Sequence, residues 1–394
     1  MENIKKIEET LNSVLTFVEL NDYKGYNKYD ALDSSILSPL SFNTKYLRLL
    51  YSQLIMRFPL NIRPLFLIPK TKNPKGIALF AMAFLNLYKV KEEQKYLTKA
   101  ENLLDWLLKN YSEGFSGICW GYQYPWQDVG FYAPRNFPNR VVTYFVCTAL
   151  LDGYEVTGKK LYLDAVKSAT EFILHDPKIL YEDVQMKCMS YVPDNRINWV
   201  VMDVSALCGS LLSRLHYLSP DEKLRLEARK LIFYVVDKQT SYGAWYYTHP
   251  PKAHHKTHDN YHTGYICDAI LDYSNYTGDT SFKENYQIGL EYYLQNLFMS
   301  NGAPKWMNDK IFPMDIHGSA QGIISFLKGN ILDKKYKEFS WEIANWAIDH
   351  LFCNKKGYFY YQKKRFYTKR FTLMRWCNGW MSRALSQLIR SYYE

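Results

Sequence analysis

Two short motifs place a carboxylate beside an imidazole. The first is Asp259-Asn260-Tyr261-His262-Thr263-Gly264, and the second is Asp315-Ile316-His317-Gly318. Each stands just ahead of a long apolar stretch, and the two histidines are 55 residues apart in the chain. Carboxylates and imidazoles within hydrogen-bond reach of a reacting bond act as general acids and bases. We therefore predict a catalytic set made up of Asp259, Tyr261, His262, Asp315 and His317, with the first motif favoured.

Helix capping offers a competing explanation for the two aspartates. Asp259 and Asp315 stand two or three residues before a periodic apolar run, where helix N-caps are expected. Capping alone would account for both carboxylates. Two histidines at equivalent places in a repeat, each behind an aspartate, favour chemistry instead. The sequence leaves this choice open.

Helical periodicity of apolar residues dominates the chain. Apolar side chains recur every three or four positions from Val142 to Tyr154, and again from His262 to Tyr273. Thr-Gly follows each run, at Thr157-Gly158 and Thr277-Gly278, and a second amphipathic run begins at once. Glycine just past a helix end supplies a left-handed C-cap, so each pair of runs predicts a helical hairpin.

The hairpins form a repeat that runs through the whole chain. Their first helices are predicted to begin near Lys75, Arg140, Asn198, His262, His317 and Arg375, at intervals of 65, 58, 64, 55 and 58 residues. The last of these helices has no following partner, and an amphipathic helix at Ile4–Phe17 can pack against it to close a ring. No Pro/Gly/Ser-rich linker interrupts the repeat, so we predict one domain over residues 1–394. The predicted fold is all-α, a single (α/α)6 toroid with short β-hairpin-like loops at the helix ends.

With this organisation, the chain resembles the six-hairpin (α/α)6 toroid superfamily. That group includes glycoside hydrolases, polysaccharide lyases, sugar 2-epimerases and the catalytic domain of glucuronyl C5-epimerases. The motifs N-Y-H-T-G-Y, T-G-D and N-G-A-P-K-W, followed by P-M-D-I-H-G-S-A-Q-G, also look like proteins encoded in bacterial surface-polysaccharide clusters. The resemblance implies a carbohydrate-related role.

In such a ring the inner helices begin at the mouth of a funnel, so residues at their starts line one cavity. The helix N-termini direct backbone donors and a positive dipole into this space, which suits an anionic or hydroxyl-rich ligand. A loop that proline and glycine keep out of a helix adds aromatic rings, which either stack on sugar faces or plug the toroid. The predicted substrate-binding residues are Trp120, Tyr122, Tyr124, Trp126 and Asp128 of this loop, with Arg135, Arg140, Asn198, Arg375 and Asn378 near the helix starts.

Three functions remain open at this point. The first is glycosidic-bond cleavage in an acidic bacterial poly- or oligosaccharide, with Asp259 or Asp315 as proton donor or base; glycosidases commonly need two carboxylates. The second is proton abstraction next to a uronate carboxylate by His262 and Tyr261, as in a C5-epimerase or a polysaccharide lyase, with arginines stabilising the developing charge. The third is a non-catalytic glycan-binding scaffold in polysaccharide biosynthesis.

Composition and motifs limit the partners. The net charge of +10 is spread along the chain without a long basic block, so we expect no nucleic acid, whereas acidic glycans suit this charge. Phosphate-binding glycine loops and dinucleotide fingerprints are absent, and no cofactor is predicted. Five histidines between His249 and His262 lie in a proline-containing polar loop without an H-E-x-x-H motif or a cysteine partner, so we predict no metal.

The compartment is predicted from three further features. The N-terminal stretch lacks the apolar core of a secretory signal. The most apolar segment, Gly76–Tyr88, is shorter than the roughly 20 residues that cross a bilayer. Seven scattered cysteines show no paired spacing. We therefore expect a cytoplasmic protein without a transmembrane segment, and the sequence does not determine its oligomeric state.

Overall fold

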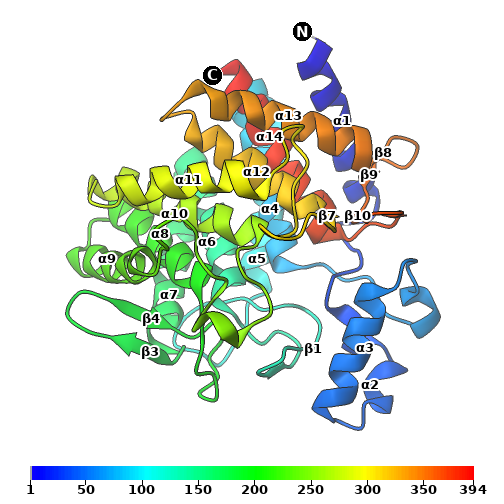
Figure 1. Cartoon of the computed structure of the whole chain (residues 1–394), viewed down its shortest axis with the longest axis horizontal. Helices are drawn as coiled ribbons and strands as arrows, with labels where there is room; N and C mark the ends of the chain where they lie inside the picture. Colours follow the sequence, from blue (N-terminus) through cyan, green and yellow to red (C-terminus); the bar gives the residue numbers. More distant parts are fainter. Residues whose placement is uncertain (1) are drawn as a thin grey trace.

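Six inner helices form a closed ring in the computed structural model, which describes residues 2–394 (Figure 1). Each inner helix contacts the next one, and the last contacts the first. The inner helices are α4 (Pro74–Lys91), α6 (Arg140–Thr157), α8 (Met202–Leu218), α10 (Asn260–Thr277), α12 (Ile316–Gly329) and α14 (Trp380–Tyr393). The predicted (α/α)6 toroid is confirmed.

A second layer of helices packs around this ring. Five of the outer helices follow their inner partners directly in the chain. The sixth, α1, contacts α14 through an apolar face that includes Ile7, Leu11 and Val14. The outer helices are α1 (Glu2–Leu20), α5 (Gln94–Lys109), α7 (Lys160–His175), α9 (Glu222–Asp237), α11 (Lys283–Leu297) and α13 (Lys334–Leu351).

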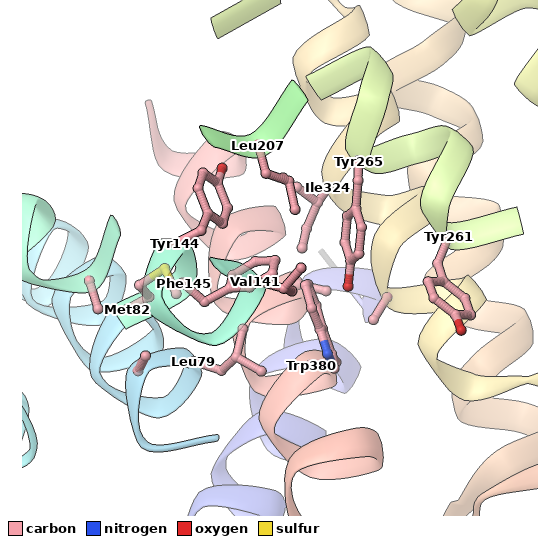
Figure 2. Close-up of a cluster of buried hydrophobic side chains, with 14 of the residues drawn as sticks. Leu79, Met82, Val141, Tyr144, Phe145, Leu207, Tyr261, Tyr265, Ile324 and Trp380 are labelled. Carbon is pink, nitrogen blue, oxygen red and sulfur yellow. The ribbon is translucent and has the colours of Figure 1, made fainter. Parts of the chain in front are cut away.

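The centre of the ring is filled by side chains from all six inner helices (Figure 2). Full burial of one such large apolar side chain stabilises the fold by about 1.5–3 kcal/mol, so this cluster fixes the helices against one another. It includes Leu79 and Met82 of α4, Val141, Tyr144 and Phe145 of α6, Leu207 of α8, Tyr261 and Tyr265 of α10, Ile324 of α12 and Trp380 of α14.

Glycine ends two of the inner helices as predicted. Gly158 has φ 69° and Gly278 has φ 73°, and their backbone N–H groups donate to Tyr154 and Ser274 carbonyls. Two other helix starts differ from the prediction. Inner helix α8 begins at Met202 rather than near Asn198, because Val200–Val201 pairs with a strand. The last inner helix is preceded by a π-helical turn, η4 (Met374–Gly379).

Short antiparallel strands lie in the segments that connect an outer helix to the next inner helix. The pairs are β1 with β2, β3 with β4, β5 with β6 and β8 with β9, and β10 lies between β7 and β11. Their bounds are β1 (Trp126–Gln127), β2 (Tyr132–Ala133), β3 (Ile179–Glu182), β4 (Lys187–Met189), β5 (Val200–Val201), β6 (Thr248–His249), β7 (Met314–Asp315), β8 (Phe352–Cys353), β9 (Tyr358–Phe359), β10 (Gln362–Lys363) and β11 (Thr368–Lys369). A 3-10 turn, η3 (Pro251–Ala253), follows β6.

Residues 30–70 form a small lobe beside the ring that the periodicity of the sequence does not predict (Figure 1). This α2–α3 lobe contains η1 (Asp30–Asp33), α2 (Leu37–Leu40), α3 (Lys45–Arg57) and η2 (Arg63–Phe66). It has its own core of Ala31, Leu37, Ile55 and Ile68. A buried ion pair between Arg63 Nε and Asp30, 2.8 Å long, joins its two ends. From residue 2 to residue 394, no helix has the length and apolar character needed to span a bilayer.

Candidate functional site

A cavity of about 610 Å³ lies where the inner helices begin. Side chains from the starts of five inner helices and from η4, the turn that precedes α14, line it, as the funnel geometry predicts. The contributors are Lys75 of α4, Val141 of α6, Asp203 of α8, Tyr261, His262 and Tyr265 of α10, His317 of α12, and Arg375 and Trp376 of η4.

Asp259 and His262 form a hydrogen-bonded pair at the edge of this cavity. Asp259 occupies the N-cap position of α10, but its carboxylate accepts no hydrogen bond from the helix backbone. It accepts instead from His262 Nδ1 at 2.6 Å and from Lys256 Nζ at 3.1 Å. The capping explanation is therefore wrong for this side chain. The pair fixes the imidazole and leaves Nε2 without a hydrogen-bond partner within residues 2–394, in a side chain that lines the cavity.

The charges around Asp259 are strongly coupled. Burial raises the pKa of Asp259, but His262 and Lys256 outweigh it and hold that pKa well below its usual range. Burial lowers the pKa of Lys256, but the Asp259 carboxylate outweighs it and raises that pKa. Lys256 Nζ also donates to the Tyr261 hydroxyl at 3.2 Å. Asp259 is thus a buried anion at neutral pH, a state that suits orienting His262 and opposes proton donation.

Asp315 has a different environment from Asp259, although both precede an inner helix. Its carboxylate accepts from the His317 backbone N–H at 3.0 Å, so here the capping explanation is confirmed. Gln362 Nε2 and Trp376 Nε1 donate to the same carboxylate at 2.7 and 2.8 Å. Asp315 is buried and does not line the cavity. It holds the start of α12 against β10 and η4.

His317 lines the cavity as a neutral imidazole. Its Nε2 shares a hydrogen bond of 2.8 Å with the Tyr265 hydroxyl. Its ring lies parallel to Tyr261, with centroids 4.3 Å apart, and stacks on Trp380 at 4.4 Å. Burial and the nearby Lys75 ammonium lower its pKa well below the usual range. His317 is more tightly enclosed than His262.

Three basic side chains line the cavity without a carboxylate partner within residues 2–394. Lys28 Nζ lies 3.7 Å from the centre of the Trp376 ring, and Lys75 Nζ lies 3.8 Å from that of Phe145. Arg375 is buried, and its Nε and Nη2 atoms have no hydrogen-bond partner. Burial lowers the pKa of Lys28 to about 7 and that of Lys75 well below its usual range. Of these three residues, only Arg375 was predicted from the sequence to bind substrate. Lys28 lies in a segment for which no element was predicted, and Lys75 was used only as the predicted start of a helix.

Asp203 is a cavity carboxylate that sequence reasoning missed. It is the second residue of α8, it is buried, and its Oδ1 has no hydrogen-bond partner in the described part of the chain. Burial raises its pKa, opposed by His262 and Lys75 and reinforced by Asp259. The signal was present in the sequence, because Asp203 opens an apolar helix. The predicted start near Asn198 concealed it.

The aromatic loop divides between the cavity and the core. Tyr122, Trp126 and the half-buried Asp128 line the cavity, and burial raises the pKa of Asp128. Trp120 is fully buried, and its Nε1 donates to the Leu107 carbonyl at 2.9 Å. Tyr124 stacks on the far side of Tyr122, with centroids 5.3 Å apart, and does not line the cavity. The structure thus places Trp120 and Tyr124 behind the cavity wall, and substrate binding by them stays a prediction.

Four other predicted binding residues also lie outside the cavity. Arg135 is exposed and pairs with Asp33, and Asn198 is exposed before β5. Arg140 is fully buried beside the Met189 carbonyl, 3.3 Å away. Asn378 is buried, and its side chain accepts a hydrogen bond from the Phe359 N–H and donates one to Thr372 Oγ1. The structure therefore does not bring these four side chains to the cavity that His262, His317 and Arg375 line.

The histidine-rich loop brings together the rings of His254 and His255 at the cavity, with centroids 4.2 Å apart, but not that of His258. His258 Nδ1 bonds to the Trp245 carbonyl at 2.8 Å, and its Nε2 bonds to the Tyr242 hydroxyl at 3.0 Å. Since His258 precedes α10, its spacing of four from His262 does not place both rings on one helix face. Across residues 2–394, no three His, Cys, Asp or Glu side chains are grouped as metal ligands.

Comparisons with known proteins identify the fold. No family model matches the chain, and no curated protein matches it. Cellobiose 2-epimerase from Bacillus thermoamylovorans B4167 superposes with a TM-score of 0.63 at 14% identity, covering 82% of this chain and 87% of that one. An inactive α-1,6-mannanase variant from Salegentibacter sp. HEL1_6, solved with α-1,6-mannotriose, gives 0.60 at 14% identity, covering 83% and 91%.

An unsaturated glucuronyl hydrolase specific for heparin gives a TM-score of 0.61 at 11% identity, covering 99% of this chain and 96% of that one. At these identities the likeness establishes the fold alone, which is an (α/α)6 toroid of six helical hairpins. Solved structures with this fold include both hydrolases and epimerases of carbohydrates.

Proposed function

We propose that this (α/α)6 toroid is an acid–base enzyme acting on an acidic oligo- or polysaccharide. Its reaction is proton abstraction from the carbon next to a uronate carboxylate. One observation carries the proposal: the Asp259–His262 pair and the unpaired cations Lys28, Lys75 and Arg375 line the same cavity. A base and an anion-binding surface are the two requirements of this chemistry.

His262 serves as the base. Its Nδ1–H is held by the ionised Asp259, so Nε2 carries a lone pair into the cavity. The sugar C5–H proton moves to Nε2, and the electron pair of that bond moves into the carboxylate to form an enediolate. Asp259 stabilises the resulting imidazolium, as a carboxylate does for histidine in the Ser-His-Asp arrangement.

The cations bind the uronate and stabilise the enediolate. A buried charge without a partner costs several kcal/mol, and a bound carboxylate would offset that cost. Arg375 has free guanidinium donors for two parallel hydrogen bonds to a carboxylate. The bound carboxylate favours the protonated forms of Lys28 and Lys75, so charge that develops on its oxygens meets these groups and the Arg375 guanidinium. A neutral sugar would gain nothing from these three side chains.

The product depends on where the enediolate next reacts. Protonation of C5 from the opposite face gives the C5 epimer, and the candidate proton donor is Asp203, a buried carboxyl group at the cavity wall whose pKa is raised by burial. Departure of the C4 substituent instead gives an unsaturated sugar, with a proton passing to the leaving oxygen. Either path uses the same base and the same cations.

Glycosidic-bond cleavage is the second candidate, and Asp203 is the observation that favours it. A carboxyl group with a raised pKa at a cavity wall has the character of a glycosidase general acid. Asp128, which lines the same cavity, would supply the second carboxylate. Asp259 and Asp315 suit this role less well, since one is held as an anion and the other accepts three hydrogen bonds.

Incubation with a glucuronate-containing oligosaccharide in D2O distinguishes these reactions. Deuterium at C5 without cleavage indicates epimerisation, and an ultraviolet-absorbing product indicates elimination. Cleavage to saturated sugars without C5 deuterium would establish hydrolysis and refute proton abstraction. Binding without any turnover would favour the glycan-binding scaffold.

A further inference from the structure

The α2–α3 lobe exposes an unusual amount of apolar surface. Ten of the 27 large apolar side chains exposed between residues 2 and 394 lie from Ile36 to Leu67. On α3, Tyr46, Leu50 and Leu54 are 82%, 58% and 41% exposed. Their spacing of four residues places them on one stripe of the helix. Water contact with such a stripe is unfavourable, so the stripe is a candidate binding surface.

The only acidic side chains of this lobe, Asp30 and Asp33, are paired with Arg63 and Arg135, and the charges that follow them are all basic. No aspartate or glutamate occurs from Ser34 to Lys91, whereas Lys45, Arg48, Arg57 and Lys70 all lie in the lobe. Lys45, Arg57 and Lys70 are exposed. The lobe therefore combines apolar and basic side chains, the pattern of helices that lie in the surface of an anionic bilayer.

The lobe also forms part of the cavity wall. Leu49, Gln53 and Met56 of α3 line the cavity, and Lys369 Nζ of β11 donates to the Met56 carbonyl at 2.8 Å. The apolar stripe adjoins the cavity-lining side of the same helix, because Gln53 and Arg57, which line the cavity, lie three residues after Leu50 and Leu54. Whatever covers the stripe is thus held beside the cavity.

We propose that the α2–α3 lobe binds the surface of an anionic lipid bilayer. The apolar stripe enters the headgroup region, and the basic side chains meet the lipid phosphates. A helix of 13 residues is about 20 Å long, so α3 lies in the surface and does not cross the bilayer. A second copy of the chain suits the lobe less well, because its basic residues would repel their own kind.

Lipid binding would place the cavity within reach of glycans carried on lipids. That consequence rests on the proposed function, since it concerns the substrate of the same cavity. The binding itself requires no catalysis, so vesicle binding and turnover can succeed or fail independently.

Co-sedimentation of the full chain with vesicles tests the proposal. We expect binding to phosphatidylcholine vesicles containing about one third phosphatidylglycerol, weak binding to phosphatidylcholine alone, and loss of binding as salt rises. The triple variant Tyr46→Ser/Leu50→Ser/Leu54→Ser should lower the partition coefficient at least about tenfold. The variant Lys45→Glu/Lys70→Glu should also lower it at least about tenfold, because each substitution replaces a charge that attracts anionic lipid with one that repels it.

A matched control is the triple variant Leu161→Ser/Leu226→Ser/Ile331→Ser. These side chains are 62%, 51% and 66% exposed and lie outside the lobe, so vesicle binding should be unchanged. Circular dichroism of each variant verifies folding. Equal loss in the control, absence of wild-type binding, or equal binding to neutral and anionic vesicles would overturn the proposal. The proposal would also be overturned if the wild type failed to bind vesicles and formed a dimer in sedimentation velocity that Tyr46→Ser/Leu50→Ser/Leu54→Ser dissociated.

Discussion

Replacing Asp259 by asparagine should lower both the stability of the fold and the rate of turnover. The carboxylate is buried and accepts from Lys256 Nζ at 3.1 Å and His262 Nδ1 at 2.6 Å. Asp259→Asn keeps the shape but leaves the buried Lys256 ammonium without a counter-charge. Removing one partner of a buried ion pair costs about 3–5 kcal/mol. Since the amide oxygen still accepts one hydrogen bond, we expect a loss of about 3 kcal/mol in the free energy of unfolding.

The same change should slow turnover by about 10³–10⁴-fold, because His262 loses the carboxylate that orients it and stabilises its charged form. Asp203→Asn provides the comparison. Burial disfavours the Asp203 anion and its Oδ1 has no partner within residues 2–394, so this variant should be as stable as the wild type or more stable by about 1 kcal/mol. It should nevertheless lose activity.

Urea unfolding at several pH values completes this test. The pKa of Asp259 is lower in the folded state than in the unfolded state, so its stabilising contribution is present above about pH 4 and is lost as the pH falls further. The difference in unfolding free energy between wild type and Asp259→Asn should therefore narrow below about pH 4. Equal stability of the two proteins at pH 7, or a larger loss in Asp203→Asn, would refute the reasoning.

Three further predictions concern the cavity and its supports. Because burial lowers the pKa of Lys28 to about 7, affinity for a uronate oligosaccharide should fall as the pH rises through 7, and Lys28→Gln should flatten that slope in calorimetric titrations. Asp315→Ala removes a helix cap and the acceptor of hydrogen bonds from two buried side chains. Chemical denaturation should show a free energy of unfolding lower by about 3 kcal/mol. An unchanged free energy of unfolding would show that Asp315 does not hold α12 in place. A methyl group at Gly264 would lie 2.7 Å from Gln321 Cγ and 2.9 Å from the Tyr293 hydroxyl. Gly264→Ala should therefore lower the free energy of unfolding by about 1–3 kcal/mol. An unchanged midpoint of chemical denaturation would show that α10 and α12 are packed more loosely.

The architecture was predictable because its signals are local. Apolar periodicity and the glycines at 158 and 278 mark the hairpins, and the repeat then places His262, His317 and Arg375 in one cavity. Asp203 was missed because a two-residue strand delays α8 by four residues. Lys28 was missed because it belongs to no repeat.

The roles of the two aspartates could not be separated from sequence. Both stand at the N-cap position of an inner helix. Their partners decide the difference: Lys256 and His262 lie close in the chain to Asp259, but Gln362 reaches Asp315 only through the pairing of β7 with β10. A contact between strands 47 residues apart has no local signature.

The most direct measurement of the central claim is solvent exchange at the sugar carbon next to the carboxylate. Wild-type protein and His262→Gln are incubated with a glucuronate-containing oligosaccharide in D2O, and NMR follows the C5 signal. His258→Gln is the control, because that imidazole bonds to the Trp245 carbonyl and does not line the cavity. We predict exchange by wild type and the control variant, and at least about a 10²-fold loss in His262→Gln. Unchanged exchange in His262→Gln, or cleavage without exchange in the wild type, would contradict the account.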